Sequence, residues 1–278
     1  MTWKELTGKI QELIETPKSE FEKYDSNEVL SLLIRERFIA RAAQSTFKDS
    51  IILKGGLLLT LVYTKSARYT GDADIGLKNA RVLADYKKAV DAVLAVDLKD
   101  DFSFSRNEGE LLSNEEREYD GAQFNIACTF DGKQRTIFIL DIGVGDAVDP
   151  VAGKLPTLTV FETTSIEMKV YPPETIAAEK YHAVVNFGAR NTRLKDFYDL
   201  FMLRDHVVKD KFKEAVKLTF ERRKTELSSI LPELPKEDMQ LRWERFLASR
   251  QYRIIKKVPQ DFQKVLSAIR EFYDAVKQ

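Results

Sequence analysis

Apolar residues recur at two different spacings along the first 170 residues, and the spacing predicts which segments are helices and which are strands. Between residues 28 and 44 they recur every three or four positions, as on the buried side of a helix, with Ser26 or Asn27 as its N-cap. Asp131-Gly132 predicts a hairpin turn between two strands. We expect helices at 28–44, 57–63 and 83–96, and strands at 51–54, 72–78, 101–106, 121–131, 135–144 and near 158–168.

The pattern changes at Pro172-Pro173, beyond which almost no strand signal remains. Helices are expected at 174–187, 193–205, 209–229, 236–250 and 258–276, separated in part by prolines. The sequence therefore predicts an α+β fold with two domains. A mixed sheet flanked by helices occupies residues 1–170, and a helical bundle occupies residues 171–278.

Composition narrows the class of protein. Apolar residues make up 44% and charged residues 32%, which is typical of a solvated globular protein. The 44 Lys and Arg equal the 44 Asp and Glu, so net charge indicates neither a nucleic acid nor a membrane as partner. Cys128 is the single cysteine, which excludes an intrachain disulfide, and two histidines argue against zinc. The charged N-terminus and the absence of a long apolar run favour a cytoplasmic protein that does not cross a membrane.

Two aspartates stand two residues apart in the strand expected at 72–78. Alternate residues of a strand project to the same face, so the carboxylates of Asp72 and Asp74 should point the same way. Like charges at that spacing repel each other unless a cation lies between them, and carboxylate oxygens suit Mg²⁺. The alternative is a strand that ends in solvent, and for an isolated Asp-x-Asp that alternative is favoured.

A third carboxylate lies in the apolar strand expected at 135–144, where Asp141 interrupts the run. If this strand neighbours 72–78, Asp141 faces the same cluster, and three carboxylates can hold two metal ions for phosphoryl or nucleotidyl transfer. The alternative is that Asp141 caps a turn.

Residues upstream of the acidic pair suit a phosphate. Lys54-Gly55-Gly56 follows a strand and precedes a helix, where glycines let the backbone approach an anion closely. Arg68 and Thr70 come shortly before Asp72, and Arg68 could bind a phosphate. Each signal alone is weak, since a Gly-Gly after a strand is often only a turn.

Together these residues resemble the AbiEii/AbiGii toxin family, a branch of the DNA-polymerase-β-like nucleotidyltransferases. The first block is LKGGLLL followed by RYTGDADI, and the preceding ERFIAR is similar to the family's lead-in helix. A second block, YPPETIAAEKYHAVVNFGARNTRLKDFYDLF, is similar to a family segment with Ala-Glu-Lys and Arg-x-Lys-Asp-x-x-Asp helices. The resemblance covers about residues 28–201.

The resemblance implies transfer of a nucleoside monophosphate from an NTP, GTP among the candidates, with release of pyrophosphate. It assigns Asp72, Asp74 and Asp141 to a Mg²⁺ or Mn²⁺ ion and Lys180 to the triphosphate, and these four residues are the candidate catalytic set. The candidate nucleotide-binding residues are Lys54, Gly55, Gly56, Arg68, Thr70, Arg193, Asp196 and Asp199. An ion pair between Arg193 and Asp196 within one helix is the structural alternative for the last group.

The resemblance also implies an acceptor and a partner. Some family members add nucleotides to the 3′ end of tRNA as toxins of toxin–antitoxin or abortive-infection systems, which implies a tRNA acceptor and a cognate antitoxin. Basic clusters that could bind RNA, or could equally be solvated helix faces, are Arg190/Arg193/Lys195, Arg222-Arg223-Lys224 and Arg250/Arg253/Lys256/Lys257. Two other hypotheses stay open: transfer to a protein or small molecule, and a nucleotide- or antitoxin-binding module without turnover.

Overall fold

The computed structural model divides the chain into two compact units. One consists of Met1–Gly145 with Pro150–Val170, and the other of Asp146–Asp149 with Tyr171–Gln278. The structure describes residues 1–17, 21, 24–63, 70–112, 121–145, 148–161, 165–187, 193–227, 236–249 and 258–277.

The first unit is built from helices and a mixed sheet, which confirms the predicted α+β class. Its helices are α1 (Trp3–Glu15), α2 (Ser26–Gln44), α3 (Gly55–Leu58), which continues as a π-helical turn at Leu59–Tyr63, and α4 (Leu83–Leu94). Its strands are β1 (Ile51–Lys54), β2 (Ala73–Leu77), β3 (Phe102–Arg106), β4 (Glu110–Leu112), β5 (Gly121–Phe130), β6 (Lys133–Gly143), β7 (Val151–Pro156) and β8 (Ser165–Val170).

The strands form one sheet in the order β3-β5-β6-β2-β1-β8-β7, with β4 paired to β5 beside that path. The β2–β6 and β1–β8 pairs are parallel, and the others are antiparallel. The parallel pairs bring together strands that are far apart in the sequence. As a result β2, which carries the acidic motif, lies between β1 and β6.

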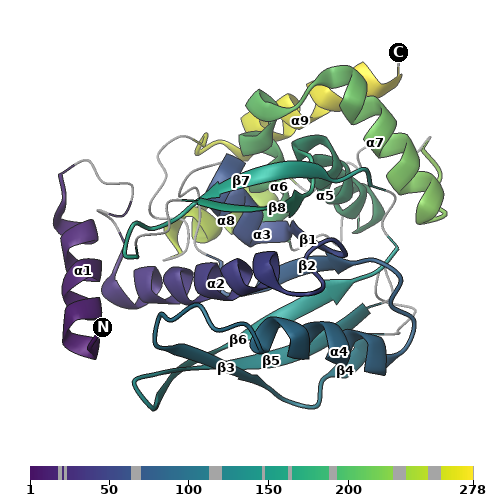
Figure 1. The fold of residues 1–278 in the computed structure, drawn as a ribbon. Coiled ribbons are helices and arrows are strands. Elements are labelled where there is room, and N and C mark those ends of the chain that lie inside the picture. The colour runs from purple at the N-terminus through teal and green to yellow at the C-terminus, as the bar shows by residue number, and fades with distance from the viewer. Residues whose placement is uncertain are drawn as a thin grey trace. The chain divides into compact units, whose positions relative to one another are not determined.

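Helix α2 packs on the sheet with α4 beside it (Figure 1). Phe38 of α2 contacts Phe104 of β3 and Phe138 of β6 with ring centroids 5.8 and 5.5 Å apart. The N-cap of α2 is Asp25, whose side chain accepts from the Glu28 amide, so the expected cap at Ser26 or Asn27 was wrong by one or two residues. Burial of apolar rings such as these stabilises the unit by about 25 cal/mol per Å² of apolar surface.

One predicted strand, near 158–168, was correct only in its last residues. Residues 157–161 lie outside any strand, and the sheet instead contains β7 and β8 on either side of them, paired antiparallel. Leu158 and Val160 are nevertheless buried, because this connection packs on the core of the unit. Strand geometry was thus predicted correctly for residues 165–168, which lie in β8, and wrongly for residues 158–161, where the apolar positions indicated burial alone. Helix α1 and strands β4 and β7 were not predicted.

The second unit is helical. Its elements are α5 (Pro173–Phe187), α6 (Leu194–Leu203), a 3₁₀ turn at Arg204–His206, α7 (Lys209–Arg222), α8 (Lys236–Ala248) and α9 (Phe262–Lys277). Its core is aromatic: Tyr181 contacts Phe212 and Phe220, and Trp243 contacts Phe262. Among the described residues of the whole chain, no helix has the length and apolar character needed to cross a membrane.

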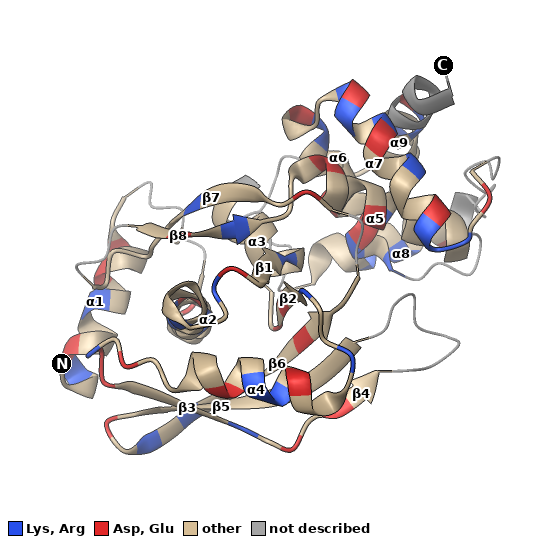
Figure 2. Cartoon of the chain, turned by 45° about the vertical axis from the view of Figure 1, so that its right-hand side comes forward, with Lys and Arg blue, Asp and Glu red and all other residues tan. Residues whose placement is uncertain are grey.

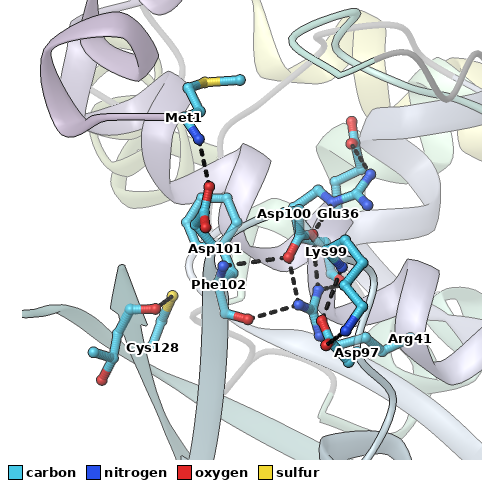
Figure 3. A network of polar contacts seen from close by, with 11 residues as sticks. Met1, Glu36, Arg41, Asp97, Lys99, Asp100, Asp101, Phe102 and Cys128 are labelled. Carbon is cyan, nitrogen blue, oxygen red and sulfur yellow. Dashed lines mark hydrogen bonds and ion pairs between the residues drawn. The ribbon is translucent and has the colours of Figure 1, made fainter. Parts of the chain in front are cut away.

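Helix α2 carries charged side chains into the core of the first unit. Arg41 donates to both carboxylate oxygens of Asp100 at 2.6 and 3.0 Å, and Arg37 donates to the same carboxylate at 2.7 Å. Arg41 also donates to the Phe102 carbonyl at 2.7 Å (Figure 3). Arg37, Arg41 and Asp100 are each at most 3% exposed. The network fastens α2 to the start of β3.

Glu36, in the same helix, is 1% exposed and accepts a 2.6 Å hydrogen bond from the Leu158 amide. Burial raises the pKa of Glu36 to about 7, against smaller opposing effects of the Leu158 amide and Arg37. The folded state therefore binds this proton more tightly than the unfolded state, whose Glu pKa is near 4.5. Stability associated with Glu36 is greatest below pH 4.5 and falls as the pH rises to about 7.

Substituting Glu36→Gln should remove this pH dependence, because the amide keeps the shape and an oxygen for Leu158 but cannot ionise. The wild type loses this stabilisation as the pH rises, and the variant does not. The free energy of unfolding of the variant minus that of the wild type should therefore increase by up to about 3 kcal/mol from pH 4 to pH 8. Urea unfolding of both proteins at the two pH values measures the difference. A difference that is the same at both pH values would contradict the raised pKa.

Candidate active site

A row of polar side chains crosses four neighbouring strands of the sheet. Lys54 of β1 is paired with Asp74 of β2, Asp74 with Asp141 of β6, and Asp141 with Gln123 of β5. Residues paired across strands project to the same face of a sheet, so these four side chains share one face. Three of them were candidate site residues, and the fourth, Gln123, was not.

This face is the one turned away from α2. Along β5 and β6 the residues alternate: Phe124 and Leu140 are fully buried, and Phe138 contacts Phe38 of α2. Gln123 and Asp141 have the opposite parity and are half-buried. The alternation within β6 also shows that Asp141 lies inside a strand, which excludes its interpretation as a turn cap.

Asp74 packs against the glycine pair at the start of α3. Gly55 has φ +67°, and a Cβ at this position would lie 2.1 Å from Asp74 Oδ2 and 2.6 Å from Asp74 Cβ. The Gly56 amide donates to Asp74 Oδ2 at 3.3 Å. The first turn of α3 therefore supports the carboxylate of Asp74, and glycine at position 55 is required both by the backbone and by the close approach.

Asp141 is held by its other neighbour in the row. Gln123 Nε2 donates to Asp141 Oδ1 at 2.7 Å, a short and well-formed hydrogen bond. Sequence reasoning missed Gln123 because nothing in the local pattern of β5 distinguishes it from any other half-exposed strand residue. Only the pairing of β5 with β6 identifies it.

The segment before β2 carries the remaining candidates. Asp72 is exposed and lies one residue before the strand begins, while Thr70 is 7% exposed. Between them, the Gly71 carbonyl accepts a 3.3 Å hydrogen bond from the buried Arg35 of α2. Arg68 lies outside the described residues. Helix α2 thus anchors the backbone immediately before Asp72.

A divalent metal would find oxygen ligands here but no complete protein cage. Within the described part of the chain, no three His, Cys, Asp or Glu side chains form a group that could hold a metal ion. Asp74 and Asp141 are lateral neighbours on parallel strands, which places their backbones about 4.8 Å apart. Two carboxylates supplemented by substrate phosphates are a usual set for Mg²⁺, so the residues fit an ion that binds together with a nucleotide.

The row also has an internal charge balance. Asp74 and Asp141 are like charges side by side, a destabilising arrangement in a sheet. Lys54, the next residue in the row, is 4% exposed and lies on the same face as Asp74. A buried lysine is rare unless it is paired, so the position of Lys54 suits a role in offsetting the negative charge of the row.

The helical unit contains a second cluster of candidate residues. Lys180 of α5 contacts Asp196 at 3.1 Å and Asp199 at 2.6 Å, both on α6. Asp196 and Asp199 are 1% and 2% exposed. Arg193 contacts Asp196 at 3.0 Å, so the ion pair considered as the structural alternative is present. The four residues therefore form one network, in which both carboxylates orient the Lys180 ammonium.

The candidate basic clusters differ in how far their residues are exposed or already engaged in contacts. Arg223 is engaged within its own unit, where it contacts His182 at 3.1 Å and Glu179 at 3.6 Å. Arg222 and Lys224 are exposed. Acidic and basic residues are interspersed along the helices of this unit (Figure 2). Arg190, Arg250, Arg253, Lys256 and Lys257 lie outside the described residues.

Comparison with known proteins agrees with the resemblance and extends it. The model of the family described as nucleotidyl transferase AbiEii toxin, type IV toxin–antitoxin system, matches residues 37–268. The match includes β1, β2, β6 and the Lys180 cluster, and it continues through α7 and α8 into α9, beyond the residues on which the resemblance rested. Comparison with curated proteins gave no match.

Membership of such a family implies a nucleoside triphosphate as substrate, typically with a divalent metal, and an antitoxin as partner. A family model that covers most of the chain, together with the acidic residues at paired positions of β2 and β6, settles the assignment: the chain belongs to the AbiEii family of nucleotidyltransferase toxins.

Proposed function

We propose that this enzyme transfers a nucleoside monophosphate from an NTP to the 3′ end of tRNA in the cytoplasm, with Asp72, Asp74 and Asp141 at the reacting phosphate. The observation that carries the proposal is the pairing of Asp74 with Asp141 on parallel strands, beside the glycine turn that supports Asp74. The family match supports nucleotidyl transfer, and this geometry supports Asp74 and Asp141 as residues that take part in it.

In the proposed reaction a hydroxyl oxygen of the acceptor attacks the α-phosphorus of the NTP. The new oxygen–phosphorus bond forms as the bond from the α-phosphorus to the bridging oxygen of the β-phosphate breaks, and pyrophosphate leaves. Asp141 accepts the hydroxyl proton or serves as a metal ligand, and substitution of this residue removes both roles. The phosphates are bound by Lys54, Arg68 and Lys180, and the backbone approaches them closely at Gly55 and Gly56. The nucleotide is supported, or Lys180 is oriented, by Thr70, Arg193, Asp196 and Asp199.

Asp74 and Asp141 would hold Mg²⁺, or Mn²⁺ in its place, together with the substrate phosphates, and Asp72, one residue before the strand, is the third candidate ligand. When bound, such an ion neutralises charge that develops on the phosphate oxygens. The protein's own contribution is positioning: Gly56 holds Asp74, Gln123 holds Asp141, and Arg35 holds the backbone before Asp72. Reactions of this kind depend mainly on positioning and on charge neutralisation rather than on covalent chemistry by the protein.

The family resemblance and a set of exposed cations support tRNA as the acceptor. Helix α7 carries the exposed Lys209, Lys211, Lys213, Lys217 and Arg222, against the exposed Asp210, Glu214 and Glu221. This modest excess of cations suits contact with a phosphate backbone, which would weaken as salt increases.

The test is to incubate the protein with Mg²⁺, each NTP labelled at the α-phosphate, and total cellular RNA and protein. Label on tRNA supports the proposal. Label on protein or on a small molecule would show the same chemistry with a different acceptor. Measurable NTP binding without transfer to any of these acceptors would reject the assigned reaction.

Substituting Gly55→Ala should slow nucleotidyl transfer at least about tenfold, because it displaces Asp74. A tenfold loss requires only that this displacement raise the activation free energy by about 1.4 kcal/mol. The added Cβ would overlap the side chain of Asp74, and the backbone at φ +67° disfavours any residue but glycine. The rate of transfer and the melting temperature are the quantities to measure.

Gly132→Ala is the matched control. Gly132 also has a positive φ, of +66°, but nothing lies within 4 Å of a Cβ added there. Both variants carry the same kind of backbone cost, and only Gly55→Ala displaces Asp74. Equal transfer rates in the two variants would show that Asp74 does not need this support.

A further inference from the structure

Gln123 is the one member of the polar row that no candidate site included. It lies in the middle of β5, half-buried, and its amide nitrogen is 2.7 Å from Asp141 Oδ1. The register confirms that the contact is built into the sheet, because Gln123 and Asp141 are paired residues of β5 and β6. Backbone pairing on both strands therefore fixes the distance over which the side chain must reach.

Asp141 needs such a partner for a physical reason. The terminal torsion of an aspartate is broad, so its carboxylate can rotate unless something holds one of its oxygens. Its lateral neighbour Asp74 carries the same charge and pushes it away. A donor on the opposite side can fix the orientation of the carboxylate.

The chemistry of the donor matters as much as its position. A lysine or arginine at position 123 would also hold Asp141, but it would cancel the negative charge that the site uses. The side chain of Gln123 is neutral, so it donates one hydrogen bond and leaves the formal charge of Asp141 unchanged. The pair is therefore suited to present a charged carboxylate in one orientation.

We propose that Gln123 is a positioning residue that orients the Asp141 carboxylate for nucleotidyl transfer, an inference that rests on the proposed function of Asp141. A purely structural role is a poor explanation of this side chain. The apolar residues of β5 that pack in the core, Phe124 and Ile126 among them, face the other way. The strand itself is held by its backbone pairing with β6.

Two near-isosteric substitutions test the proposal. Gln123→Met keeps length and packing but removes the donor, and Gln123→Glu replaces the donor with a like charge. We expect kcat to fall about 10-fold to 100-fold in Gln123→Met and further in Gln123→Glu, as is usual when a residue that orients a metal ligand is changed. The KM for NTP and the melting temperature of Gln123→Met should stay close to those of the wild type.

A second readout is independent of turnover. Titration of the metal-free protein with Mn²⁺ in the presence of a non-hydrolysable NTP analogue, followed by calorimetry, should show an affinity reduced about tenfold in Gln123→Met. The control is Gln134→Met, since Gln134 is an exposed glutamine near the turn of the same hairpin and should behave as wild type in both assays.

The proposal would be overturned if both the kcat and the Mn²⁺ affinity of Gln123→Met lie within about twofold of the wild-type values. It would also be overturned by a loss that Gln134→Met reproduces. Failure of the proposed function has a different signature: the wild type itself would transfer nothing to any acceptor. In that case the Mn²⁺ titration still decides whether Gln123 positions Asp141.

Discussion

Asp74→Asn should reduce the rate of nucleotidyl transfer by about 10³-fold or more, because loss of this charge removes roughly 4 kcal/mol of stabilisation from the transition state. Asp74 is one of the two inner members of the polar row, paired with Lys54 on one side and Asp141 on the other. Asparagine has the same shape and can still accept from the Gly56 amide. The substitution therefore changes the charge and leaves the packing against Gly55 intact.

Stability should move in the opposite direction to activity. Asp74 and Asp141 repel each other across the β2–β6 pair, so Asp74→Asn should leave the free energy of unfolding unchanged or raise it by up to about 1 kcal/mol. Asp131→Asn is the matched control, because Asp131 is exposed in the β5–β6 turn with φ +52°, which asparagine tolerates. A variant at position 74 that loses both activity and stability would point to a structural carboxylate instead.

Asp100→Ala should lower the free energy of unfolding by about 3–5 kcal/mol, which is the usual cost of leaving buried charges without their partner. The substitution leaves the guanidinium groups of Arg37 and Arg41 in the core without the carboxylate that both contact. Urea unfolding at neutral pH measures the loss. Asp97→Asn serves as control, since Asp97 is largely exposed and its 2.5 Å ion pair with Lys99 lies at the surface.

The same network predicts a pH dependence. Burial by itself would raise the pKa of Asp100, but the hydrogen bonds and charges of Arg41 and then Arg37 together outweigh it and lower the pKa below 3.8. The stabilisation is therefore complete above pH 3.8 and is lost as the pH falls through the lowered pKa of the folded state. Asp100→Ala should remove this acid-dependent loss. If the free energy of unfolding of Asp100→Ala at pH 7 is close to that of the wild type, the stabilising role of this network is contradicted.

The local pattern of the sequence was sufficient for the elements around the site. Alternating residues predicted β2 and β6, the glycine pair predicted the break between β1 and α3, and Pro172-Pro173 predicted the change to helices. These features depend on neighbours within a few residues, which a single sequence contains. The sequence predicted that Asp141 lies near Asp74 only if β6 is adjacent to β2. The structure confirms that these two strands are paired.

Pairings between distant segments could not be predicted in the same way. Gln123 acquires its role only because β5 lies beside β6, and Asp100 only because Arg37 and Arg41 of α2 lie beneath it. Leu158 is buried in a connection that packs on the core rather than in a strand, and its amide donates to the carboxylate of Glu36. Each case is set by tertiary packing, for which the apolar pattern carries no separate signal.

Catalysis of nucleoside monophosphate transfer by the Asp74–Asp141 pair is tested most directly with one NTP, labelled either at the α- or at the γ-phosphate. Wild-type protein, Asp74→Asn and Asp131→Asn are incubated with each form, Mg²⁺ and purified tRNA. We expect α-label on tRNA and γ-label only in pyrophosphate, with both signals lost in Asp74→Asn and retained in Asp131→Asn. Label from the γ-phosphate on the acceptor, or undiminished transfer by Asp74→Asn, would contradict nucleotidyl transfer by this pair.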